Sequence, residues 1–174
     1  MGRPVCFALL SLHPASAQRY LKFAAQGDPL LATGRTQEAL LGYERSFKAR
    51  KTSRGAYGIA ECHRPNSATT DTAWHRTALG LAKKEYTKAE KAADKWDCLY
   101  QMAYCSQRLG EHEQALKWFS NISTNDKHAS VEIARSLLAM GRHDEALGTL
   151  AHVTERYPEE TKGFIEECNN ALGR

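Results

Sequence analysis

Four side chains in the middle of the sequence are of the types that bind zinc. They are two cysteines and two histidines: Cys98, Cys105, His112 and His128. Structural zinc sites take their ligands in pairs separated by about two to four residues, and none of the four has a partner at that distance. Cys62 and His63 are adjacent, and adjacent side chains do not chelate one ion comfortably. The sequence therefore predicts no metal site.

Two short clusters combine a histidine with carboxylates, the composition of a general acid–base pair. They are residues 111–113 (Glu-His-Glu) and 143–145 (His-Asp-Glu). Both occupy the same place in a repeated pattern, at the start of a predicted helix, where carboxylates favour the positive end of the helix dipole. No phosphate-binding glycine loop or Gly-x-Ser-x-Gly turn is present. We therefore predict no catalytic residue, no cofactor and no enzymatic activity, and no constellation supports a small hydrolase or metal enzyme.

Basic residues gather in the segment Lys83–Lys95, which contains five lysines with three acidic residues between them. Such a mixture is typical of a solvated helix face. A nucleic-acid site would also need exposed aromatic side chains there, and we expect Tyr86 and Trp96 to pack inwards. The net charge of the 174-residue chain, +4, is small for a nucleic-acid-binding protein.

The candidate residues lie within a stretch, residues 96–158, that repeats itself at an offset of 31 residues. The paired positions carry the same or similar residues: Gly110 and Gly141, His112 and His143, Ala115 and Ala146, Phe119 and Leu150. A repeat of this length indicates a helix pair that cannot bury its apolar side alone and must stack on neighbouring pairs.

The pattern resembles the tetratricopeptide repeat (TPR) family. That family is marked by a small residue in the first helix, glycine at the turn, alanine early in the second helix, an aromatic residue four places later and a closing proline. One copy carries Ala103, Gly110, Ala115 and Phe119. The next carries Ala134, Gly141, Ala146, Leu150 and Pro158. An earlier copy carries Gly27, Gly34, Ala39, Tyr43 and Ser46, so the resemblance covers roughly residues 20–158.

The resemblance implies an all-α fold, a right-handed solenoid of antiparallel helix pairs with about four repeats. A C-terminal capping helix from Pro158, with a polar outer face, would close the array. We assign residues 18–174 to this TPR-like helical repeat domain.

Residues 1–17 form either an N-terminal arm or helix, or a targeting segment. The first 27 residues contain no acidic residue, and residues 15–17 (Ala-Ser-Ala) have the small-x-small form of a signal cleavage site. Five cysteines without a Cys-x-x-Cys pair favour a reducing compartment. We expect a cytoplasmic protein, or an organellar or secreted one if the segment is a targeting signal.

Several helix boundaries can be predicted. Pro29 removes a helical hydrogen bond, so a kink or restart is expected at Asp28. Residues 64–71 predict a polar loop, followed by a helix that ends at residues 83–84. Residues 87–90 form a capping box, and we favour one helix over residues 88–109, about 33 Å long. The alternative is two helices separated at Asp94.

In the TPR family, the first helix of each pair lines a concave surface, and its outward positions contact the ligand. Carried over residue by residue, these positions imply a protein-binding groove that includes Tyr100, Tyr104, Gln107, Arg108, His128 and Arg135. Tyr100 and Tyr104 replace the Lys and Asn with which some members hold a peptide carboxylate. Aromatic and Arg side chains suit a peptide or partner helix instead, although Tyr100 has the alternative of packing against a neighbouring helix.

We therefore expect a non-catalytic scaffold or adaptor with a protein or peptide partner, within a larger complex. The alternative is a helical-repeat RNA-binding protein, suggested by the basic N-terminal half. Such proteins read bases through regularly placed positions, and that regularity is missing, so the sequence argues against nucleic acid. No stretch reaches the length of a membrane-spanning helix.

Overall fold

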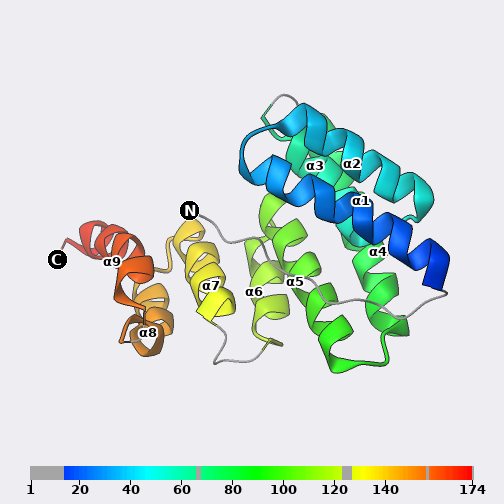
Figure 1. The fold of residues 1–174 in the computed structure, drawn as a ribbon. Coiled ribbons are helices and arrows are strands. Elements are labelled where there is room, and N and C mark those ends of the chain that lie inside the picture. Colours follow the sequence, from blue (N-terminus) through cyan, green and yellow to red (C-terminus); the bar gives the residue numbers. More distant parts are fainter. Residues whose placement is uncertain (1–13, 66–67, 123–126, 156, 174) are drawn as a thin grey trace. The chain divides into compact units, whose positions relative to one another are not determined.

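A computed structural model describes residues 14–65, 68–122, 127–155 and 157–173, in which helices are the only regular elements. Nine helices follow one another in these ranges: α1 (Pro14–Ala32), α2 (Thr36–Ala49), α3 (Ser53–His63), α4 (Ala68–Lys88), α5 (Ala92–Arg108), α6 (His112–Phe119), α7 (Lys127–Ala139), α8 (His143–Thr154) and α9 (Pro158–Leu172) (Figure 1). The predicted all-α class is confirmed. None of the described helices is long and apolar enough to cross a membrane.

The helices form two compact units, residues 1–109 and residues 110–174. In the first unit, α1 packs against α2, α3 against α4, and α2 and α4 each pack against the helix that follows. The helices α1, α3 and α5 also contact one another in that order. We call α1, α3 and α5 the inner row, and α2 and α4 the outer row.

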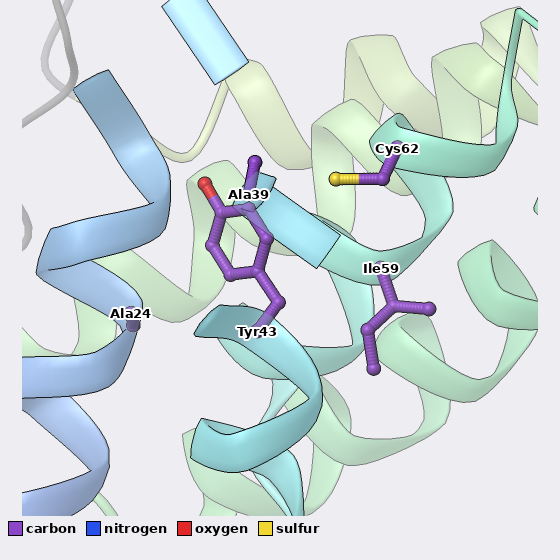
Figure 2. Close-up of a cluster of buried hydrophobic side chains, with 5 residues drawn as sticks. All are labelled: Ala24, Ala39, Tyr43, Ile59 and Cys62. Atoms are coloured by element: carbon purple, nitrogen blue, oxygen red, sulfur yellow. The ribbon is translucent and has the colours of Figure 1, made fainter. Parts of the chain in front are cut away.

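Tyr43 of α2 joins three helices in the core of the first unit (Figure 2). Tyr43 is 3% exposed, and its ring lies against two glycines: a Cβ atom would come within 2.9 Å of the ring at Gly27 in α1 and within 2.2 Å at Gly58 in α3. The hydroxyl donates a hydrogen bond of 2.7 Å to Asp28, which also pairs with Arg54. These contacts position α1 and α3 of the inner row. The ring fixes the distance between the two helices, and the polar contacts of Asp28 fix how the helices are aligned with each other.

The helix restart that the sequence allowed at Asp28 is not observed, because α1 continues through Pro29 as one helix; a kink there stays a prediction. Pro29 leaves the carbonyl of Ala25 without its helical donor, but Ala25 is exposed and water can take the donor's place. The helix ends as expected at Gly34, which has a φ of +77°. The amides of Gly34 and Arg35 donate to the carbonyls of residues 31 and 30, as in a Schellman motif.

The boundaries predicted for α4 and α5 are also wrong. α4 begins at residue 68, before the expected loop has ended, and it runs on to Lys88. Thr87 lies inside it and donates its hydroxyl proton to the carbonyl of Lys84, so it does not cap a following helix. The helical structure is interrupted at residues 89–91. Neither a single helix over residues 88–109 nor two helices separated at Asp94 are observed. A tertiary contact explains the extension: Glu85 near the end of α4 accepts hydrogen bonds from the backbone and hydroxyl of Ser53.

The second unit contains α6 to α9, in which α7 packs against α6, α8 and α9. Its core is formed by small and aliphatic side chains of three helices: Ala134, Leu137, Ala146, Leu150 and Cys168. Gly141, with a φ of +72°, ends α7 with the same pair of backbone hydrogen bonds as Gly34 ends α1. Pro158 begins α9, whose Glu166 and Glu167 are exposed, as expected of a cap.

The predicted domain limits remain predictions. Residues 1–13 lie outside the described part of the chain, and so does Cys6. The proposed boundary between residues 17 and 18 falls within α1.

Candidate protein-binding surface

One face of α5 carries large side chains at a spacing of four residues. They are Trp96, Tyr100, Tyr104 and Arg108, and residues four apart are neighbours on a helix surface. The Tyr100 and Tyr104 rings are stacked, with centroids 6.0 Å apart and an angle of 19° between their planes. Tyr104 also lies 6.4 Å from the ring of Tyr57 in α3. We call Trp96, Tyr100, Tyr104 and Arg108 the aromatic row. It runs along α5, and through Tyr104 it reaches α3, the neighbouring helix of the inner row.

Exposure differs along the aromatic row. Tyr100 is buried, Tyr104 is half-buried, and Trp96 is 47% exposed. The expectation that Trp96 packs inwards is wrong, because the buried side of this part of α5 is formed by Asp94 and Cys98 instead. Trp96 is thus a candidate contact residue that the sequence did not identify, and the four-residue spacing to Tyr100 was the available signal.

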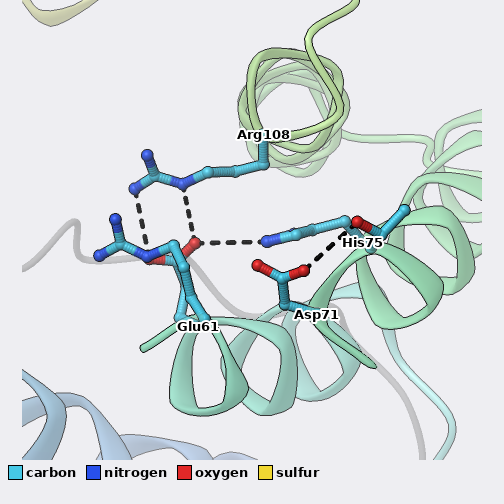
Figure 3. Close-up of polar contacts among 6 residues, drawn as sticks. Glu61, Asp71, His75 and Arg108 are labelled. Atoms are coloured by element: carbon cyan, nitrogen blue, oxygen red, sulfur yellow. Dashed lines mark hydrogen bonds and ion pairs between the residues drawn. The ribbon is translucent and has the colours of Figure 1, made fainter. Parts of the chain in front are cut away.

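Glu61 of α3 holds the C-terminal end of the row in place (Figure 3). Its carboxylate is 9% exposed and accepts two hydrogen bonds from Arg108, from Nε at 2.8 Å and from a terminal nitrogen at 3.2 Å. Arg64 approaches the same carboxylate to 3.4 Å. Arg108 therefore ties α5 to α3, and its charge is compensated within the protein.

His75 of α4 completes this polar cluster. It is 1% exposed, and its Nε2 atom lies 3.5 Å from the Glu61 carboxylate. Neither ring nitrogen makes a hydrogen bond within the described residues. Burial lowers the pKa of His75 more than the negative charge of Glu61 raises it. The ring is therefore neutral at pH 7, and its role is to fill the space between α3, α4 and α5.

The six predicted groove residues fall on two first helices. Tyr100, Tyr104, Gln107 and Arg108 lie on α5 in the first unit, and His128 and Arg135 lie on α7 in the second. Gln107 is half-buried and His128 is exposed. Arg135 is paired with Glu132 at 3.1 Å, and its guanidinium carbon lies 5.0 Å from the centre of the Phe164 ring in α9. That these residues contact a partner stays a prediction.

Neither a metal site nor a reactive thiol is found among the residues that the structure describes. No three His, Cys, Asp or Glu side chains there are grouped closely enough to hold a metal ion. Four cysteines are buried and free: Cys62, Cys98, Cys105 and Cys168. Burial raises the pKa of the first three to about 12, so their nucleophilic thiolate form is scarce at neutral pH.

Comparison with known families agrees with the geometry. A family model described as anaphase-promoting complex, cyclosome, subunit 3, which is a TPR-type repeat family, matches residues 71–153. No curated protein matches the chain. The matched residues include the whole of α5, α6 and α7 and both turn glycines of the predicted repeats, Gly110 and Gly141. Over residues 71–153 the chain is therefore a helical repeat protein of the TPR type.

Proposed function

We propose that the chain is a non-catalytic protein-interaction module that binds a peptide or a helix of a partner protein. The match to a TPR-type family supports this class, because such families are generally non-catalytic and bind proteins. The observation that carries the proposal is the aromatic row, in which Trp96 is exposed at the end of a stack of tyrosines. Large exposed aromatic side chains are enriched at the energetic centres of protein interfaces.

The residues of the row would have different roles. Trp96 would bury its ring against the partner, and Tyr104, half-buried, would add apolar surface with a polar edge. Gln107 would supply hydrogen bonds. Arg108 would mainly hold the surface in shape, because its charge is already balanced by Glu61. In the second unit, the exposed guanidinium of Arg135 and the side chain of His128 would form a separate contact.

We further infer that the protein works as a scaffold or adaptor within a larger complex. The matching family is described as a subunit of a multi-subunit assembly, the anaphase-promoting complex. The described cysteines are reduced and buried, which favours a reducing compartment such as the cytoplasm.

Affinity capture from the native source tests the proposal. Trp96→Ala, Tyr104→Ala and Arg135→Ala are compared with the wild type by quantitative mass spectrometry of the captured proteins. Leu41→Ala is a matched control, because Leu41 of α2 is 55% exposed and lies outside the aromatic row. We expect the same partner to be lost with Trp96→Ala and Tyr104→Ala and kept with Leu41→Ala, with circular dichroism unchanged. Equal capture by all variants would remove the proposed surface.

A further inference from the structure

The first unit has a groove on its outer row. The groove lies between the C-terminal end of α2 and the middle of α4 and has a volume of about 470 Å³. Along α4 it extends from Ala73 to Lys84, about 16 Å at 1.5 Å per residue. None of its lining residues belongs to α5, so the groove is distinct from the aromatic row. We call it the outer groove.

The floor of the outer groove is apolar. Phe47 and Trp74 pack edge to face, with ring centroids 5.1 Å apart, and Leu81 lies about two turns beyond Trp74 along α4. All three side chains are half-buried, so part of each remains available to a ligand. Such a floor suits an aliphatic or aromatic side chain.

The rim of the outer groove is basic. Lys51, Arg76 and Lys84 are exposed lining residues, and none of the described residues that line the groove carries a carboxylate. No ion pair joins any of these three cations to a carboxylate in the described part of the chain. They differ in this from Arg108 and Arg142, which are each paired with a carboxylate. The rim can therefore pair with carboxylates of a ligand without first breaking an internal contact.

The surrounding charge has the same sign. Residues 1–109 contain seventeen Lys and Arg against nine Asp and Glu, a net charge of +8, whereas residues 110–174 contain seven against eleven, a net charge of −4. A second groove, between α1 and α2, is also lined by cations without a carboxylate: Lys22, Arg45 and Lys48. A field of one sign over a surface attracts partners of the opposite sign and raises their rate of association.

Gly80 keeps the outer groove open. It lies in the middle of α4, where glycine is less stable than alanine by about 1 kcal/mol. A Cβ atom at this position would have no other heavy atom within 4 Å. Core packing therefore does not require the glycine, and any side chain placed there would enter the space that a ligand would occupy.

We propose that the outer groove binds an acidic amphipathic segment of a partner protein. An aliphatic or aromatic side chain of the segment lies on the floor of Phe47, Trp74 and Leu81, and its flanking carboxylates pair with the basic rim. A segment of about three helical turns matches the length of the groove. A protein is favoured over RNA because base stacking uses exposed aromatic rings, and the two rings of the floor, Phe47 and Trp74, are half-buried.

The binding of synthetic peptides to the full chain tests this proposal by fluorescence anisotropy. The probe is a labelled three-turn peptide with leucines on one face and glutamates beside them. Two matched peptides replace the leucines with serine or the glutamates with lysine, and an oligouridine RNA is the fourth probe. We expect binding of the leucine–glutamate peptide only, with an affinity that falls as salt is added.

Variants then locate the site. Gly80→Leu should weaken peptide binding at least about tenfold, because the new side chain fills the groove. Gly148→Leu is the matched control, since Gly148 lies inside α8, is exposed and also has no heavy atom within 4 Å of an added Cβ; it should bind as the wild type does. Arg76→Glu should also weaken binding and repel the probe, whereas Trp96→Ala should not change it, which separates this site from the aromatic row.

Four outcomes would overturn the proposal. Equal binding of the leucine and serine peptides would show a purely electrostatic attraction, and unchanged binding by both Gly80→Leu and Arg76→Glu would place the peptide elsewhere. RNA binding that Gly80→Leu abolishes would assign the groove to nucleic acid. A dimer of the wild type that Gly80→Leu dissociates, seen by light scattering, would assign it to a second copy of the chain.

Discussion

Two glycines in the first unit should respond to the same substitution with opposite signs. Gly58 and Gly80 both lie inside helices, in α3 and α4. Replacing either with alanine removes backbone freedom from the unfolded chain and should stabilise the helix by about 1 kcal/mol. The difference between them comes from what the new methyl group meets.

At Gly58 the methyl group meets Tyr43. The added Cβ would lie 2.2 Å from the ring, far inside the contact distance of about 3.5–4 Å between carbon atoms. The ring cannot retreat easily, because Gly27 lies close on α1 and the hydroxyl is bonded to Asp28. Overpacking of this kind costs about 1–3 kcal/mol, and a contact this short belongs at the upper end. After the helix gain is subtracted, Gly58→Ala should lose about 2 kcal/mol.

At Gly80 no atom opposes the methyl group, so the full helix gain of about 1 kcal/mol should appear. For a chain of this length, the two changes correspond to a melting temperature about 4–8 °C lower for Gly58→Ala and about 2–4 °C higher for Gly80→Ala. Thermal and urea unfolding followed by far-ultraviolet circular dichroism measure both. A Gly58→Ala protein as stable as Gly80→Ala would refute the assigned packing of Tyr43.

A double substitution isolates the cause. Tyr43→Leu removes the ring and is itself destabilising, because the core loses a large buried side chain. In that background Gly58→Ala should be neutral or stabilising, so the two changes should be strongly non-additive. Additive effects would mean that the cost at Gly58 arises from contacts other than the ring.

Three further predictions concern the buried side chains of Glu61, His75 and the cysteines. Glu61→Gln should lower the free energy of unfolding by about 1–2 kcal/mol in urea titrations, less than the 3–5 of a fully buried pair, because Arg108 is 38% exposed and can regain water. The pKa of His75 lies below its ordinary value of 6.5, so its contribution to stability is complete above that pH and declines as the pH falls below it. Between about pH 7.5 and 5.5 the wild type should therefore lose more stability than His75→Gln, and equal losses would contradict a buried neutral ring. In a Cys6→Ser chain, a thiol reagent at about pH 8 should label cysteines only after unfolding, and rapid labelling of the native chain would show that the described cysteines are not buried.

The turn glycines and the buried alanines of the repeats were predictable because their signals are local. Gly34, Gly110 and Gly141 all have positive φ values, between +72° and +77°, and glycine is the residue that adopts this backbone freely. Ala39, Ala115 and Ala146 are fully buried at the places where second helices pack closely. Each of these positions can be read from its neighbours in the chain, and their recurrence at a fixed offset indicates a repeat.

The break between α4 and α5 was not predictable from local signals. Residues 87–90 have the pattern of a capping box, and the apolar phase passes through them without a glycine or proline. What decides the boundary is the bond from Ser53 to Glu85, two residues 32 positions apart in the chain. Such a contact extends α4 beyond its local end, and tertiary contacts commonly override helix propensity in this way.

The arrangement of charges explains why Arg108 was predicted from the sequence as a groove residue, whereas the cations of the outer groove were not. A cation at a ligand-facing position of the repeat looks available in the sequence, yet Glu61, 47 residues away, holds it by two hydrogen bonds. Lys51, Arg76 and Lys84 hold no special position in the repeat pattern, and only the folded chain shows that they surround one apolar floor without a carboxylate. Binding that depends on charge should therefore occur at the outer groove, and binding through aromatic side chains should occur at the aromatic row on α5. Salt should accordingly weaken binding at the outer groove far more than binding at the aromatic row, and an equal salt dependence at the two surfaces would refute this division.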